Sequence, residues 1–464
     1  MRRIAIIGSG QAGLLAAHGL VRAGHEVTLY SDRTADRWLV GSRPTGAAMR
    51  FELALAYERE LGLAHWEAAA PRIAGVHSTF CAGLGNRLAT LTGRLPADVP
   101  AFAIDLRLQS HRWMTELAAA GGRVIVEAVD VARLDEIAAR HELVIVAVGR
   151  GPLAELFPRH AGRSAYDAPQ RKLAMAIAIG GPMRIEGVPF LPAKYNQLEA
   201  AGETFWIPYF HRDHGPSWCL LFEAKPGGPM DRFDDCTTGA AVVARAKQVI
   251  DDLFPWDSAW AKDFELADPD GFVLGAVTPT VRVPVGRLPS GRAVMPLGDT
   301  AIAMDPIGGQ GANLGNKLAR HLVAAVAAAP DATFDANWMT ATFESFWADH
   351  GAATVRFNNL LLEPLTAAGK ILMISQYGSD GAGDSADQRI ADAITDNFVD
   401  PRRHTAALVD RRAACELVAS LSGRSWQRQF LGNALRVGGK QLGRLVGIPP
   451  RHPTAPASRA PRSR

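Results

Sequence analysis

The first thirty residues constrain the fold of this chain more than any other stretch. An apolar run at residues 4–7 leads into a G-x-G-x-x-G pattern at residues 8–13, and residues 11–23 then show helical periodicity up to Gly24. The segment Glu26-Val27-Thr28-Leu29-Tyr30 reads as a second strand and completes a strand, helix, strand unit. Such a unit is typical of a parallel sheet covered by helices, so the sequence predicts an α/β fold.

The glycines in this pattern predict a nucleotide site. Gly8 permits a tight turn, Gly10 lets a pyrophosphate approach the backbone, and Gly13 lets the helix pack closely on the strand, while the helix N-terminus faces the anion. An ordinary glycine turn could have the same letters, but the position between a strand and a helix favours nucleotide binding. The acid expected on the ribose hydroxyls falls near Ser31, so the following residue, Asp32, is the predicted ligand.

A second glycine-rich segment, far along the chain, distinguishes between cofactors. Leu297-Gly298-Asp299 is followed at residues 305–313 by the letters DPIGGQGAN, about where another helix starts. A nicotinamide dinucleotide needs no second distant loop, whereas a flavin has a ribityl chain and a ring that extend beyond its pyrophosphate. Asp299 can accept hydrogen bonds from ribityl hydroxyls, and backbone N–H groups of residues 311–313 can face the ring edge that becomes negative on reduction.

The hydrophobic pattern of the rest of the sequence predicts a cofactor domain that is discontinuous along the chain. An apolar run at residues 143–148 suits a strand that is buried on both faces. Alternating and aromatic segments after residue 170 indicate a mainly antiparallel sheet, and residues beyond 340 look helical. We therefore expect the following division: 1–170 cofactor domain, first part; 171–271 substrate domain; 272–340 cofactor domain, second part; 341–447 helical region; 448–464 disordered basic tail.

The paired glycine patterns resemble those of the glutathione-reductase-type FAD proteins. The spelling of residues 297–299 and 305–313 is similar to that of the styrene and indole monooxygenases, and two shorter stretches, Asp105-x-Arg107-Leu108 and Pro169-Gln170-Arg171, agree with the same family. The resemblance covers residues 1 to about 360. It implies a glutathione-reductase-type, Rossmann-like FAD domain with an inserted substrate domain.

The resemblance also implies which residues contact ligands. The segment at residues 41–46 is expected near the flavin, although its residues do not match the family pattern well. Pro306 is expected to form a wall facing the flavin ring. The implied FAD contacts are Gly8, Gly10, Gln11, Ala12, Gly13, Asp32, Arg43, Arg107, Asp299, Pro306, Gly309, Gly311, Ala312 and Asn313. The implied substrate contacts are Thr45, Gly46, Trp206, Tyr209 and Pro306. The aromatic residues near Trp206 could equally fill a core.

The activity implied by this family is a two-component monooxygenation. A separate NAD(P)H-dependent flavin reductase supplies FADH2, oxygen forms a C4a-peroxyflavin, and one oxygen atom passes to a small apolar or aromatic substrate. The flavin carries the chemistry, so no catalytic side chain is assigned.

Other activities on the same fold remain open. A single-component NAD(P)H-dependent aromatic hydroxylase usually has an Asp-Gly pair before the substrate domain, where this chain has Val148-Gly149-Arg150-Gly151. A non-oxygenating flavoprotein of the isoprenoid saturase or cyclase type, and a flavin-binding module without activity, stay as further alternatives. Halogenation is not expected, because the tryptophan pair that is typical of flavin halogenases is incomplete around Trp206.

Composition excludes several other classes. The chain of 464 residues has a net charge of +3, and four arginines after residue 450 leave the body nearly neutral, so no nucleic-acid surface is indicated. Four scattered cysteines fit neither zinc nor a disulfide framework, and His211-Arg212-Asp213-His214 reads as a solvated loop rather than a metal site. Without an apolar run long enough to span a bilayer, we expect a soluble cytoplasmic protein, with homodimerisation left open.

Overall fold

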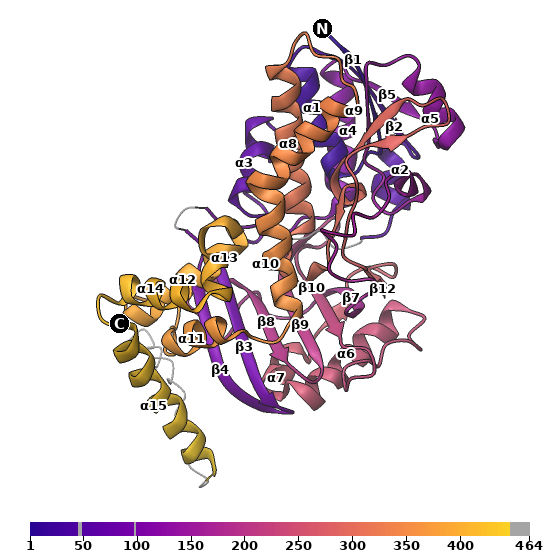
Figure 1. Cartoon of the computed structure of the whole chain (residues 1–464). Helices are drawn as coiled ribbons and strands as arrows, with labels where there is room; N and C mark the ends of the chain where they lie inside the picture. Colours follow the sequence, from indigo (N-terminus) through magenta and orange to yellow (C-terminus); the bar gives the residue numbers. More distant parts are fainter. Residues whose placement is uncertain (45–48, 97–98, 446–464) are drawn as a thin grey trace, which may run out of the picture.

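The computed structural model describes residues 1–44, 49–96 and 99–445, which fold around two large β-sheets (Figure 1). The first sheet has the strand order β14-β15-β6-β1-β2-β5. All neighbouring strands pair in parallel except β14, which is antiparallel to β15. Its strands are β1 (Arg3–Ile7), β2 (Glu26–Ser31), β5 (Arg123–Val126), β6 (Leu143–Val146), β14 (Gly286–Arg287) and β15 (Ala293–Pro296).

Helices cover both faces of this sheet. On one face, α1 (Gln11–Arg22), α4 (Leu106–Ala119) and α8 (Gly311–Ala328) share a core with the side chains of Ile4 and Ile6. On the other face, α5 (Val131–Ala138) packs on Ala5 and Ile7, the alternate residues of the same strand. Strand β6 is buried on both faces as well, with Leu143 and Ile145 in the first core and Val144 and Val146 in the second, as predicted for the apolar run at residues 143–148.

The second sheet is mainly antiparallel and has the order β11-β7-β10-β9-β8-β3-β4, with β12 paired to β7. Only β3 and β8 pair in parallel. Because of this pairing, the β3–β4 hairpin joins the second sheet, although residues 1–170 were expected to form the cofactor domain. The strands are β3 (Gly75–Gly83), β4 (Asn86–Arg94), β7 (Lys172–Ile179), β8 (Pro192–Leu198), β9 (Gly202–His211), β10 (Gly215–Ala224), β11 (Glu265–Leu266) and β12 (Phe272–Ala276).

One face of the second sheet is closed by α6 (Gly239–Leu253) and α7 (Ser258–Ala261), which share a core with Trp206 and Trp218. The opposite face is turned toward the first sheet and carries the alternate side chains of β7, β9 and β10. The remaining short elements are α2 (Ala35–Gly41), α3 (Glu52–Glu60), β13 (Thr280–Val281), β16 (Ile302–Ala303) and the turns η1 (Pro152–Leu156), η2 (Pro255–Asp257), η3 (Gly298–Thr300) and η4 (Pro306–Gly308).

The C-terminal region is helical, in agreement with the prediction. Its first helix, at residues 336–346, packs into the core of the first sheet, whereas the helix at residues 386–399 lies against β4 at the edge of the second sheet (Figure 1). Gln388 of α12 donates a hydrogen bond to the Thr92 carbonyl of β4. Nearby, Arg94 pairs with Asp392 at 2.6 Å. The helices are α9 (Ala336–Phe346), the π-helix η5 (Trp347–Gly351), α10 (Ala352–Leu362), α11 (Ala367–Ser375), α12 (Ala386–Val399), α13 (Pro401–Val409), α14 (Arg411–Ser422) and α15 (Trp426–Leu445).

The predicted basic tail at 448–464 lies outside the described residues. Among the helices that the structure describes, none combines the length and the apolar character needed to cross a bilayer.

Candidate functional site

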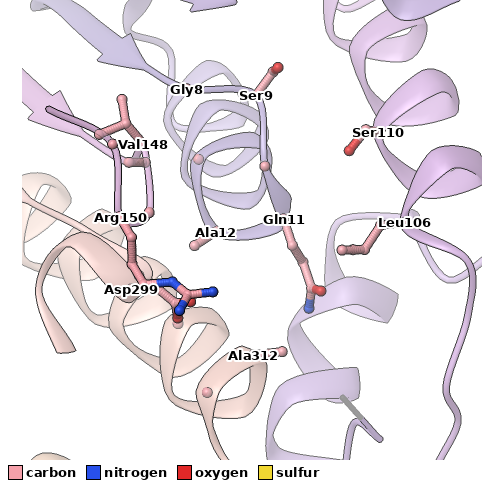
Figure 2. A pocket seen from close by; sticks show the side chains of 18 of the residues that line it. Gly8, Ser9, Gln11, Ala12, Leu106, Ser110, Val148, Arg150, Asp299 and Ala312 are labelled. Carbon is pink, nitrogen blue, oxygen red and sulfur yellow. The ribbon is translucent and has the colours of Figure 1, made fainter. Parts of the chain in front are cut away.

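A cavity of about 790 Å³ lies where the first sheet meets the inner face of the second. Its walls come from the turn after β1, the start of α1, helix α4, the loop after β6, and the segment from η3 to the start of α8 (Figure 2). The predicted residues Gly8, Gln11, Ala12 and Asp299 all line it, together with Pro306. The two glycine segments, almost three hundred residues apart in the sequence, therefore face one cavity.

The three glycines of the G-x-G-x-x-G pattern have different roles in the structure. Gly8 has φ +113°, and a Cβ there would lie 2.3 Å from the carbonyl oxygen of Ala147. A Cβ on Gly13 would lie 2.2 Å from the carbonyl oxygen of Gly8, so the third glycine permits the close contact of helix and strand. A Cβ on Gly10 would meet no atom within 4 Å. The second glycine thus faces open space, as the approach of a pyrophosphate requires.

Two helix N-termini are directed at the cavity. Helix α1 begins after Gly10 and helix α8 after Gln310, and neither has a side-chain cap or an acidic residue in its first turn. The first N–H groups of a helix have no partner within the helix, and the helix dipole adds a partial positive charge. Both ends can therefore hold an anionic group: a pyrophosphate at α1, and the negative edge of a reduced flavin at α8.

Asp32 lines the cavity at the end of β2. Its carboxylate accepts a hydrogen bond from Arg33 at 2.6 Å, which is the main reason that the pKa of Asp32 lies below its usual value. Ser31 is buried and bonds to Ser9 at 2.6 Å, so it holds the two turns together. Asp32 is thus the ionised acceptor available to ribose hydroxyls.

Asp299 lies near two arginines. Burial raises the pKa of its carboxyl, and the nearby guanidinium groups of Arg150 and Arg282 oppose that rise. Figure 2 shows the Arg150 side chain beside Asp299 at the edge of the cavity. Arg150 was not predicted as a ligand, because it follows β6 in a loop without a recognisable pattern. Its position supplies a cation at the rim of the same cavity.

The opposite end of the cavity is apolar. Alternate side chains on β7, β9 and β10 form its wall, since residues two apart on a strand share a face. Pro306 and Met304 approach this wall from the other side. Residues from the second sheet that contribute are Met175, Tyr195, Phe205, Ile207, Cys219 and Leu221. The cavity thus joins an anion-binding end to an apolar end, which fits a dinucleotide with an apolar compound beside its ring.

Comparisons with known proteins agree with this arrangement. A family model described as "Styrene monooxygenase A putative substrate binding domain" matches residues 149–259. Styrene monooxygenase StyA of Pseudomonas fluorescens is 26% identical over 418 residues, which cover 87% of this chain and 94% of that protein. The chain is styrene monooxygenase-like. It is a flavin-dependent monooxygenase, and its cofactor is FAD.

Solved structures show that the fold is shared more widely. The flavin-dependent brominase Bmp2 superposes with a TM-score of 0.57 at 15% identity, covering 78% of this chain and 87% of that one. 2-Methyl-3-hydroxypyridine-5-carboxylic acid oxygenase superposes with a TM-score of 0.54 at 14% identity, covering 84% and 96%. At these identities the likeness concerns the fold alone.

Arg107 of this styrene monooxygenase-like chain does not line the cavity, contrary to the expected FAD contact. Its guanidinium is buried and pairs with Asp105 at 2.6 Å and with Asp268 at 2.8 Å. It also contacts the buried ring of His211 at 2.9 Å. All of these groups would have to be displaced before Arg107 could reach a flavin. The D-x-R pattern therefore holds α4 on the second sheet, and Leu106 and Ser110 of that helix line the cavity instead.

The same network corrects part of the interpretation of the loop at residues 211–214. Asp213 and His214 are exposed, as expected of a solvated loop, but His211 is fully buried. Its ring, Asp213 and Asp268 offer ligand atoms within 4.8 Å of one another. The Arg107 guanidinium already contacts His211 and Asp268, so a cation is present where a metal would bind. This cluster is an ion-pair network of the protein itself.

Two predicted substrate contacts lie elsewhere. Trp206 is on the far face of β9, where its indole N–H donates to Asp257 at 3.1 Å. Tyr209 shares the inner face but is fully buried in a separate core with Ala103 and Ile177. The neighbouring Phe205 and Ile207 line the cavity instead, because one step along a strand moves a side chain to the opposite face.

The remaining predicted contacts differ in how they relate to the cavity. Gly309, Gly311 and Ala312 line it. Asn313 does not: its side-chain N–H groups donate to the carbonyls of Gly309 and Met49, so it shapes the loop. Arg43 is exposed and lies 3.9 Å from Asp270. Thr45 and Gly46 lie outside the described residues.

Proposed function

We propose that this protein takes reduced FAD from a separate NAD(P)H-dependent flavin reductase and uses it to transfer one oxygen atom of O2 to a small apolar or aromatic substrate. The second oxygen atom leaves as water, and the two electrons come from FADH2, which becomes FAD. Reduced FAD supplies the activation of oxygen when it is bound. The observation that carries the proposal is the single cavity with two helix N-termini at one end and an apolar wall at the other.

The side chains of this cavity would orient the cofactor and exclude water. We propose a glutathione-reductase-type placement of FAD, with ribose hydroxyls on Asp32, the pyrophosphate at the N-terminus of α1 and ribityl hydroxyls on Asp299. Reduced flavin carries negative charge at the edge that would face α8, where free N–H groups can hold it. Burial of the reacting centre against an apolar wall protects it from water. We propose the domain division expected from the sequence, except that residues 75–94 belong to the substrate domain rather than to the cofactor domain.

An oxygen-labelling experiment tests the function. The protein is supplied with FAD, NADH, a flavin reductase and 18O2, together with a panel of styrene-like and indole-like compounds. We expect one labelled oxygen atom in the organic product and negligible NADH oxidation when the reductase is omitted. Rapid NADH oxidation without the reductase would instead support a single-component hydroxylase. Hydrogen peroxide as the only product across the panel would support a non-oxygenating flavoprotein.

A further inference from the structure

A group of buried carboxyl side chains lies next to the apolar wall of the cavity, on the same face of β9 and β10, and has no role in the function proposed above. Glu223 of β10 and Asp305 are fully buried, and Glu203 of β9 is 8% exposed. Glu203 and Glu223 are direct neighbours across the two antiparallel strands. Like charges in this arrangement destabilise a sheet, so the cluster needs cations or protons.

Among the described residues, Arg171 is the one cation with a hydrogen bond to this cluster, and Lys225 acts on Glu203 without one. The Arg171 guanidinium binds both oxygens of Glu203, at 2.7 and 3.0 Å. Its other N–H groups donate to the carbonyls of Gln170 and Leu362. Arg171 is therefore used by Glu203, and Glu223 and Asp305 have no cation of their own.

The hydrogen-bond partners distinguish these two carboxyl groups. Burial raises the pKa of Asp305, but hydrogen bonding to Glu223 and to the backbone N–H of Ile307, which one Asp305 oxygen accepts at 3.1 Å, acts against this rise and favours the ionised form. The other Asp305 oxygen and both oxygens of Glu223 are buried and receive no N–H or hydroxyl donor. Two adjacent carboxylates without donors would be unstable, whereas one carboxyl and one carboxylate can share a hydrogen bond.

We propose that Glu223 is protonated in the working enzyme and that its O–H donates to Asp305, so that it positions the η4 turn on which Pro306 lines the cavity. Asp305 is the N-cap of this turn. Its backbone carbonyl is held by Asn358 at 3.0 Å, so the loop is braced from two sides. Loss of the proton would bring two carboxylates together directly behind Pro306 and disturb the wall.

The electrostatic surroundings agree with this assignment. Burial raises the pKa of Glu223 well above its ordinary value, and the neighbouring charges of Asp305 and Glu203 raise it further, while Arg171 acts in the opposite direction. The remaining titratable groups that face the cluster are the phenols of Tyr195 and Tyr166, together with Lys225 beside Glu203. Burial raises the pKa of both phenols above the neutral range, so these phenols stay uncharged there. Because the two carboxyl groups interact, they titrate as a pair.

The sign of the pH effect follows from this pKa. A carboxyl with a raised pKa in the folded protein binds more protons than it does in the unfolded chain. The free energy of unfolding therefore falls as the pH rises from the unfolded value of about 4.5 toward the folded value. Glu223→Gln should remove the part of this pH dependence that is due to Glu223, since an amide keeps an N–H donor for Asp305 and does not titrate, whereas Glu203 and Asp305, whose pKa values are also raised by burial, keep their own parts.

The test uses apoprotein, so it does not depend on the proposed function. Melting temperatures of the wild type and Glu223→Gln are measured from about pH 5 to about pH 9, with the exposed Glu199→Gln as a matched control. For each pH unit of the folded pKa shift that falls within this range, the variant should gain about 1–2 °C on the wild type, because one pKa unit is about 1.4 kcal/mol and the unfolding entropy of a chain of 464 residues is about 1 kcal/mol/K. Parallel curves for the wild type and Glu223→Gln would overturn the proposal.

Infrared spectra provide a measurement that does not rely on stability. The wild type near neutral pH should show the C=O band of a protonated carboxyl, which is absent in Glu223→Gln and present in Glu199→Gln. Asp305→Asn is the second variant, because it replaces the acceptor with an amide and should shift the band. A wild-type spectrum without a protonated carboxyl band, or a band that persists in Glu223→Gln, would contradict the assignment. FAD affinity measured across the same pH range then reports whether the turn transmits the change to the cavity.

Discussion

Adding one methyl group at each of two fingerprint glycines should separate cofactor binding from folding. Gly10 has φ −74° and ψ 175°, which any residue can adopt, and its Cβ would point into open space. Gly10→Ala should therefore keep the free energy of unfolding of the apoprotein, or raise it by about 0.4–1 kcal/mol through a less flexible unfolded chain. Gly8 has φ +113° and no room for a Cβ.

The two substitutions should change different free energies, that of unfolding for Gly8→Ala and that of FAD binding for Gly10→Ala. For Gly8→Ala, the backbone conformation costs about 1–2 kcal/mol, and moving the Ala147 carbonyl away from a contact of 2.3 Å costs about 1–3 kcal/mol more. For Gly10→Ala, a pyrophosphate pushed outward would lose at least one hydrogen bond to a charged group, worth about 1.5–3 kcal/mol. This loss corresponds to an FAD affinity that is weaker by about tenfold or more.

Two measurements on the same samples separate the effect of each variant on folding from its effect on FAD binding. The melting temperature of the apoprotein reports folding, and quenching of flavin fluorescence on titration reports FAD binding. Gly432→Ala is the control, because this glycine is exposed on α15 and its Cβ would also meet no atom within 4 Å. FAD binding by Gly10→Ala as tight as that of the wild type would refute the placement of the pyrophosphate. A Gly8→Ala variant as stable as the wild type would refute the packing argument.

Three further predictions concern the cavity and its surroundings. Asp299→Ala should weaken FAD binding about tenfold without lowering the melting temperature of the apoprotein, because its side chain is exposed in the open cavity; unchanged affinity in the titration would remove Asp299 from the site. Trp206→Phe should lower the free energy of unfolding by about 1.5–3 kcal/mol, since it removes the buried hydrogen bond to Asp257, and should leave substrate preference unchanged in a competition assay. Ile207→Ala, one residue further on the same strand, should instead shift kcat/KM toward bulkier substrates, and an unchanged preference would mean that this wall does not contact the substrate.

The fold and the contacts of buried charged residues could be predicted only in part from the sequence. Alternation and apolar runs predicted the helical region and the antiparallel sheet, because such patterns report local periodicity. They could not show that the β3–β4 hairpin joins the second sheet, since strand partners are chosen by packing between distant segments. The same limit applies to Arg107, whose partner Asp268 is 161 residues away along the chain.

The sequence by itself determined the elements that depend on local backbone geometry. A turn with positive φ at Gly8, an open approach at Gly10 and free N–H groups at two helix N-termini follow from residue types at fixed spacing, so residues 8–13 and 297–313 could be predicted to face the proposed FAD site. Only the tertiary structure decided which face of β9 meets the cavity and which charges share a buried space. A shift of one residue reverses the face of a strand, and the proton between Glu223 and Asp305 is required only because folding brings two carboxyl groups together away from water.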